Sequence, residues 1–182
     1  MKLDIVMPKD NEQELIEIAE KLGFKELIFL YEDLKEKPKK LKSNKIKTWT
    51  AGLVKNIKEV DKAKKNFDFL FGVTQRNFFE NKKVKYLINA EISESNDFVY
   101  QRRAGLDDVM CRLAKEKDKV IVFNTKLLTT DKHTYILGRM MQNAKLCRKY
   151  KIKTLIATLA STPLEMRAPK DLDGLARMLK LL

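Results

Sequence analysis

The chain has 182 residues, and 44% of them are hydrophobic, which is enough for one domain with a substantial core. This composition excludes a disordered chain, although 35% of the residues are charged. No uncharged apolar run approaches the roughly 18 residues that a membrane span needs, and the first ten residues lack the apolar stretch of a secretory signal. We therefore expect a single domain over residues 1–182, in the cytoplasm and without membrane contact.

The charge is strongly positive, with 38 Lys and Arg against 25 Asp and Glu, a net charge of +13. Such an excess is typical of proteins that bind nucleic acid, although many basic proteins bind none. The excess is also uneven, because residues 31–66 carry a net +7 and residues 101–182 a net +10, whereas the remaining segments are slightly negative. The positive field should therefore be concentrated on part of the surface. Charge alone leaves RNA binding and mere solubility both open.

The predicted elements begin with a short strand at residues 3–7, followed by a helix. In this helix the apolar residues from Leu15 to Leu22 recur at the spacing of one helical face. Asp10 is placed to cap its start, and Gly23 is placed to end it.

Six more apolar runs follow, each rich in the branched and aromatic residues that suit a buried strand: 26–31, 46–54, 67–73, 85–92, 119–124 and 153–160. Most of them are separated by helical patterns, at about 56–66, 106–113 and 131–150. Strands that are apolar throughout and alternate with helices predict a parallel sheet covered by helices. Both a shortened barrel and a doubly wound open sheet satisfy this pattern.

The helix at about 131–150 is predicted to bury one stripe of residues, Ile136, Met140, Ala144 and Cys147. Its polar residues, Arg139, Gln142, Asn143, Lys145 and Lys149, are expected on the other faces. Cys111 and Cys147 lie inside apolar patterns and lack the CxxC spacing of a redox motif, so both are expected as buried thiols.

Two clusters of positive charge stand out along the chain. Residues 34–47 contain seven lysines and one proline, which predicts an exposed loop. Lys39, Lys40 and Lys42 in this loop, and the adjacent pair Arg102 and Arg103, are candidate phosphate contacts by local charge density. A solubilising surface is the alternative reading of the same lysines.

Motifs for catalysis are missing from the sequence. His133 is the single histidine, so no multi-histidine metal site is available. No glycine-rich phosphate loop and no GxSxG motif occurs. Asp107 and Asp108 are adjacent, but neighbouring helical side chains point about 100° apart, so they do not form a carboxylate pair. Asp107 is better explained as an anion at the start of a helix. We therefore predict no catalytic and no metal-binding residue.

The C-terminal stretch combines a helix start with an unusual turn. Pro169 is placed to begin a helix, with Asp171 in its first turn. The preceding "PLEMR" follows the last strand and should put Glu165 and Arg167 at the mouth where parallel strands end. An arginine there suits phosphate recognition, and a structural ion pair with Glu165 fits the spacing equally well.

Several of these features occur together in a known family. They are the "GLDDV" helix start at Gly105, Phe123 at a strand end, the helix that carries Met140, Met141, Leu146, Lys149 and Tyr150, and above all P-L-E-x-R-x-P-x-D-L from Pro163 to Leu172. In these features the segment from Gly105 to Leu182 resembles the C-terminal half of the archaeal and eukaryotic family of ribonuclease P protein component 3. The first 100 residues match in element order and basic character more than in residues. Two departures are Asp108, where some members have histidine, and Gly138, where a basic residue is common.

The resemblance implies a shortened, distorted (β/α) TIM-like barrel with about seven mainly parallel strands, similar to the polymerase-and-histidinol-phosphatase superfamily without its metal-binding histidines. It also implies a non-catalytic subunit of ribonuclease P, the endoribonuclease that removes the 5′ leader from precursor tRNA. The chain would pair with protein component 2, as a dimer of heterodimers, and would stabilise the catalytic domain of the RNA component. Cleavage would be carried out by that RNA and its Mg²⁺, so the chain itself would need no cofactor and would meet precursor tRNA only indirectly.

The motifs that match the family add three basic residues to the five found from charge density. The candidate RNA contacts are therefore Lys39, Lys40, Lys42, Arg102, Arg103, Lys149, Arg167 and Lys170. Two other functions stay open. One is a stand-alone RNA-binding scaffold, and the other is a metal-dependent phosphoesterase of the same superfamily, which would need a cluster of metal ligands.

Overall fold

The computed structural model describes residues 2–35, 38, 41, 43–93 and 104–182. Seven strands form one sheet in the order of the sequence, and every neighbouring pair is parallel. The strands are β1 (Leu3–Val6), β2 (Glu26–Tyr31), β3 (Lys47–Val54), β4 (Phe69–Val73), β5 (Tyr86–Ile88), β6 (Val120–Asn124) and β7 (Lys153–Ala157). No helix in the described ranges is both long enough and apolar enough to cross a membrane.

The sheet closes on itself where its first and last strands meet. An isolated parallel bridge joins Val6 to Ala160. The Met7 N–H donates to the Ala160 carbonyl at 2.8 Å, and the Leu159 N–H donates to the Ile5 carbonyl at 2.9 Å. The seven strands therefore form a nearly closed barrel, which confirms the predicted TIM-like fold and excludes the open sheet.

A buried carboxylate strengthens this seam. Asp4 of β1 is fully buried, and its Oδ1 accepts hydrogen bonds from the backbone N–H groups of Ile5 and Thr158, each at 2.8 Å. Its Oδ2 accepts from the Thr158 hydroxyl at 2.6 Å. Burial raises the pKa of Asp4 to about 6, against the lowering effect of these bonds.

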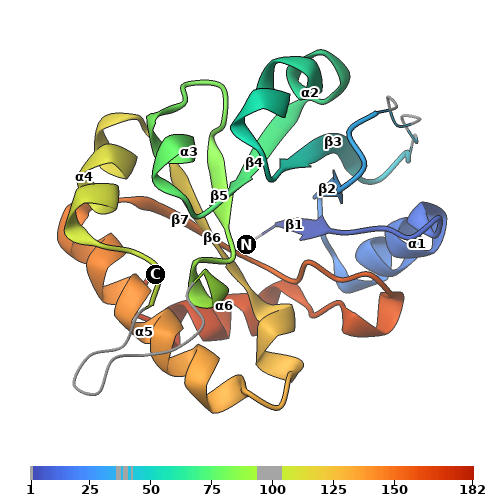
Figure 1. Ribbon diagram of the computed structural model, residues 1–182. Coiled ribbons are helices and arrows are strands. Elements are labelled where there is room, and N and C mark those ends of the chain that lie inside the picture. Colours follow the sequence, from blue (N-terminus) through green and yellow to red (C-terminus); the bar gives the residue numbers. More distant parts are fainter. Residues whose placement is uncertain (1, 36–37, 39–40, 42, 94–103) are drawn as a thin grey trace.

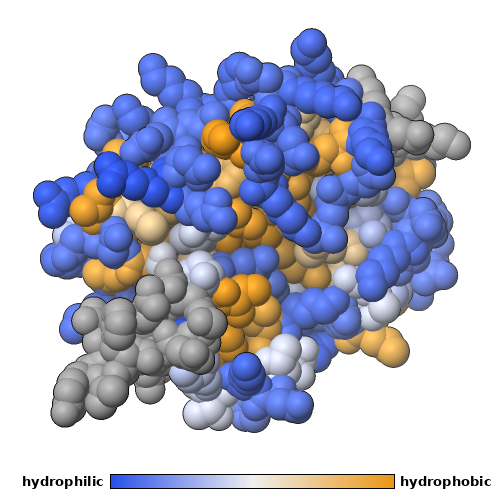
Figure 2. Space-filling model, viewed as in Figure 1, coloured by the Kyte–Doolittle hydropathy of each residue, from blue (hydrophilic) through white to orange (hydrophobic). Residues whose placement is uncertain are grey.

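Two hydrophobic layers lie on opposite faces of the strands. Alternate residues of β2 show the division, since Ile28 and Leu30 belong to the cluster inside the barrel and Leu27 and Phe29 to the cluster under the helices. Because both faces are buried, the strands are apolar throughout, as the sequence shows. In the view of Figure 2, hydrophilic side chains cover the rim of the molecule and hydrophobic ones gather towards its centre.

The described residues also form six α-helices and four short 3-10 turns, and the helices lie around the outside of the barrel (Figure 1). The helices are α1 (Glu12–Leu22), α2 (Val60–Asn66), α3 (Arg76–Glu80), α4 (Asp108–Glu116), α5 (His133–Tyr150) and α6 (Pro169–Met178). The 3-10 turns are η1 (Ile57–Glu59), η2 (Ala90–Ile92), η3 (Thr125–Thr129) and η4 (Pro163–Glu165).

The start of α1 differs from the prediction. Asn11, and not Asp10, occupies the capping position, and Asp10 adopts a left-handed conformation with φ of 58°. The Asn11 amide instead donates to the Ser161 carbonyl at 2.9 Å, which ties the helix to the segment after β7. Gly23 ends the helix as predicted, with φ of 88°.

The start of α4 depends on close packing against η2. Gly105 has φ of 91°, and a Cβ atom there would lie 1.9 Å from the Ala90 carbonyl oxygen. Asp107 caps the helix by accepting the Met110 N–H at 2.7 Å, in agreement with its predicted place at a helix start. The predicted apolar face is only partly correct, because Val109 is 46% exposed.

The apolar stripe of α5 is buried as predicted, and both cysteines are free and buried. The predicted polar faces are partly wrong, however, because Arg139 and Asn143 are fully buried. The Arg139 guanidinium donates to the Glu91 carbonyl at 2.7 Å and to the Tyr135 hydroxyl at 2.6 Å. These two residues of α5 therefore face η2 and not the solvent.

Glu91 and Asn143 form the centre of this buried polar cluster. The Asn143 amide nitrogen donates to Glu91 Oε1 at 3.1 Å and to the Ala104 carbonyl at 2.7 Å. Two acceptors, Glu91 Oε2 and Asn143 Oδ1, are buried with no hydrogen-bond partner in the described part of the chain. Protonation of Glu91 would turn one of its carboxyl oxygens from an acceptor without a partner into a donor. Burial raises the pKa of Glu91 to about 7, although the hydrogen bonds it accepts and the Arg139 charge lower it.

The Glu91→Gln variant should become more stable than the original protein as the pH rises. A raised pKa in the folded state means that stability is highest below the ordinary pKa of 4.5 and is lost as the pH rises to about 7. The glutamine side chain keeps an amide hydrogen and cannot ionise, so the difference in unfolding free energy should reach on the order of 3 kcal/mol. Urea denaturation at about pH 5 and about pH 8 measures it. The raised pKa of Asp4 affects both proteins alike, and a difference that does not change with pH would contradict a neutral Glu91.

Candidate nucleic-acid interface

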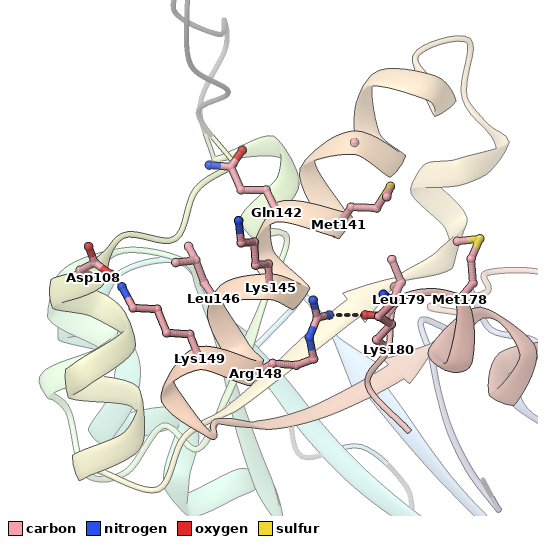
Figure 3. A pocket seen from close by; sticks show the side chains of 11 residues that line it. Asp108, Met141, Gln142, Lys145, Leu146, Arg148, Lys149, Met178, Leu179 and Lys180 are labelled. Atoms are coloured by element: carbon pink, nitrogen blue, oxygen red, sulfur yellow. Dashed lines mark hydrogen bonds and ion pairs between the residues drawn. The ribbon is translucent and has the colours of Figure 1, made fainter.

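An open groove of about 830 Å³ lies between α5 and the end of α6 (Figure 3). Its lining includes four basic side chains and a single acidic one. The residues that line it are Asp108, Gly138, Met141, Gln142, Lys145, Leu146, Arg148, Lys149, Met178, Leu179 and Lys180. An excess of cations of this kind suits a polyanionic ligand.

Helical spacing brings three of the cations together. Along α5, Arg148 lies three positions and Lys149 four positions after Lys145, and all three side chains are exposed. The Arg148 guanidinium donates to the Leu179 carbonyl, which is one of the last carbonyls of α6 and has no partner inside that helix. This contact joins the two elements, and Lys180 follows directly beside it (Figure 3). Cations from two separate elements therefore face the same groove.

Lys149 is held by an ion pair at the edge of the groove. Its Nζ lies 3.1 Å from Asp108 Oδ1, and the Tyr150 hydroxyl donates to the same oxygen. The hydrogen bonds from Tyr150 and Lys149 lower the pKa of Asp108, and the bond to Asp108 raises the pKa of Lys149. Both side chains are more than half exposed, and such pairs contribute little to stability. Lys149 can therefore exchange this carboxylate for a phosphate at small cost.

The structure describes only three of the eight predicted RNA contacts. Lys39, Lys40, Lys42, Arg102 and Arg103 lie outside the described residues. Lys149 lines the groove, whereas Arg167 lines a different cavity, and Lys170 is exposed on the first turn of α6. Lys145, Arg148 and Lys180 were not predicted as contacts. The spacing along α5 could have indicated the first two, but nothing in the sequence places Lys180 beside them.

The turn before α6 is organised by Glu165. Its Oε2 accepts the Ser161 N–H at 2.6 Å and lies 2.9 Å from the Nζ of Lys126, which follows β6. Burial opposes the ionisation of Glu165, but the hydrogen bonds from Lys126 and the backbone outweigh it and lower the pKa. The ion pair considered between Glu165 and Arg167 is therefore wrong, because Glu165 pairs with Lys126.

Arg167 makes weaker local contacts. Its guanidinium donates to the carbonyls of Leu164 and Met166, both at 3.0 Å, and the side chain is exposed. Within the described ranges, no three His, Cys, Asp or Glu side chains gather as the ligands of a metal ion would.

Glu165→Ala should destabilise the protein more than Arg167→Ala does. The first change removes the acceptor of two backbone N–H groups and of Lys126, with an expected cost of about 1–3 kcal/mol. The second removes an exposed side chain and should cost less than about 1 kcal/mol. Urea denaturation followed by circular dichroism compares them. An equal or larger cost for Arg167→Ala would make Arg167 a structural residue.

No family model matches the chain, and no curated protein matches it by sequence. Solved structures do match. A chain of the cryo-EM structure of archaeal ribonuclease P with mature tRNA superposes with a TM-score of 0.75 and 20% identity, covering 97% of this chain and 82% of that one. Histidinol phosphate phosphatase from Lactococcus lactis, in complex with zinc, L-histidinol and phosphate, superposes with a TM-score of 0.60 and 12% identity, covering 98% and 92%.

These two superpositions span almost the whole chain and agree with the barrel described above. The fold of this chain is therefore the (β/α) barrel of histidinol phosphate phosphatase and of a chain in archaeal ribonuclease P.

Proposed function

We propose that the chain is a protein subunit of ribonuclease P, of the protein component 3 family. The observation that carries the proposal is the superposition on a chain of archaeal ribonuclease P over 97% of the residues. The sequence supports it independently through P-L-E-x-R-x-P-x-D-L between Pro163 and Leu172. The two lines of support are separate, because one compares backbones and the other compares side chains.

The task of the subunit in this proposal is to neutralise phosphates that crowd together in the folded RNA component. Lys and Arg spread over a surface perform this task without a catalytic side chain. Hydrolysis of the 5′ leader of precursor tRNA belongs to the RNA and its Mg²⁺. By family analogy the chain pairs with protein component 2, as a dimer of heterodimers in the cytoplasm, and holds the catalytic domain of the RNA.

Two alternatives are weaker. A stand-alone RNA-binding scaffold would account for the net charge of +13 but not for the C-terminal motif. A metal-dependent phosphoesterase would require a cluster of metal ligands, and the described ranges bring no such cluster together. Tight stoichiometric binding of a metal ion by the purified protein would favour the phosphoesterase.

Adding the chain to archaeal ribonuclease P RNA and protein component 2 should accelerate leader cleavage at limiting Mg²⁺. We expect a gain of about tenfold or more, because basic side chains replace part of the charge screening by Mg²⁺. Cleavage of labelled precursor tRNA measures the rate. The control is an unrelated folded protein of similar positive charge. No gain would contradict the proposal, and an equal gain from the control would favour a scaffold.

A further inference from the structure

We infer that the α5–α6 groove binds the sugar-phosphate backbone of RNA through Lys145, Arg148, Lys149 and Lys180. The inference rests on the proposed function and specifies which surface performs it. It adds three cations to the single residue of the groove, Lys149, that the sequence indicated.

The positions of the cations support a track for consecutive phosphates. Lys145 and Lys149 lie one helical turn apart, about 6 Å along the axis of α5. Their side chains project from the same side of the helix, and Lys180 approaches from the end of α6 (Figure 3). A polyanion lying along α5 would therefore meet several cations in succession, each of which could displace a condensed counterion.

The rest of the lining favours the RNA backbone over bases or a protein. No aromatic ring lines the groove in the described part of the chain, and stacking of unpaired bases depends on such rings. The exposed apolar side chains in the groove are Met141 and Met178, at 56% and 52% exposure. Protein interfaces depend on buried aromatic or arginine anchors with few lysines, whereas three of the four cations here are lysines.

Asp108 opposes the binding of a phosphate in this groove. Its Oδ1 forms an ion pair with the Nζ of Lys149 at 3.1 Å, and Asp108 is the single acidic residue that lines the groove. An RNA phosphate that contacts Lys149 must displace Asp108 or lie close to it. Loss of the carboxylate should therefore strengthen RNA binding, whereas loss of the lysines should weaken it.

The test compares two double variants that remove the same charge from different faces. Lys145→Gln with Lys149→Gln changes the groove, and Lys62→Gln with Lys65→Gln changes exposed positions of α2, which lies apart from α5 in Figure 1. Binding of fluorescent archaeal ribonuclease P RNA and of polyuridine is measured over a series of salt concentrations. Thermal melting followed by circular dichroism shows whether each variant is folded.

The groove variant should lose about tenfold or more in affinity for both RNAs. The slope of log affinity against log salt should fall by about 1.5–2, close to one unit for each lost contact. The α2 variant should change much less. The Asp108→Asn variant should instead gain affinity and bind RNA several-fold more tightly. This measurement tests the inference even if the double groove variant fails to fold.

Three outcomes would overturn the inference. Equal losses of RNA affinity in the groove and α2 variants would mean that RNA binding depends only on the net charge of the protein. Unchanged affinity in the folded groove variant and in Asp108→Asn would mean that RNA binds elsewhere. Retained RNA affinity in the folded groove variant, together with lost binding of protein component 2 when the same variant is tested for it, would make the groove a protein-docking face. The proposed function fails separately, if the unmodified protein shows no salt-dependent affinity for RNA.

Discussion

The closure of the sheet between β1 and β7 is the constraint on which the structure depends. Asp4 accepts the backbone and hydroxyl hydrogens of Thr158, and the flanking backbone groups of Ile5 and Leu159 are bonded directly. Without this seam the inner layer of side chains would be open along one edge. A carboxylate can lie at this buried place because its oxygens accept from Ile5 in β1 and from Thr158 directly after β7.

Closure also decides where function can lie. In a parallel barrel the carboxyl ends of all strands meet at one mouth, which is the usual place for a ligand. In the described part of this chain, Lys126 and Glu165 near this mouth pair with each other and stabilise the turn before α6. The larger concentration of cations lies on the outside, between α5 and α6. An outer surface suits a large polyanion better than a mouth does, because many phosphates can be contacted at once.

Helix α5, which lines the groove, is held in place on its buried side by polar contacts. Arg139 and Asn143 of α5 bind Glu91 and Ala104, so the helix cannot rotate without breaking hydrogen bonds in a dry environment. On the opposite side of α5, Arg148 binds the end of α6. The cations of the groove are therefore carried by an element whose orientation is set by contacts on two sides.

The sequence by itself determined the number and order of the strands, the helix that begins at Pro169, and the buried stripe of α5, because these follow from apolar periodicity and local capping. It indicated a basic surface, and its C-terminal motif indicated a family. Closure of the barrel, the burial of Arg139 and the pairing of Glu165 with Lys126 were decided only by the tertiary structure. Each of them joins residues that are distant in the chain, so no local pattern records them. The groove has the same origin, since Lys145 and Lys180 share it only because the end of α6 lies against α5.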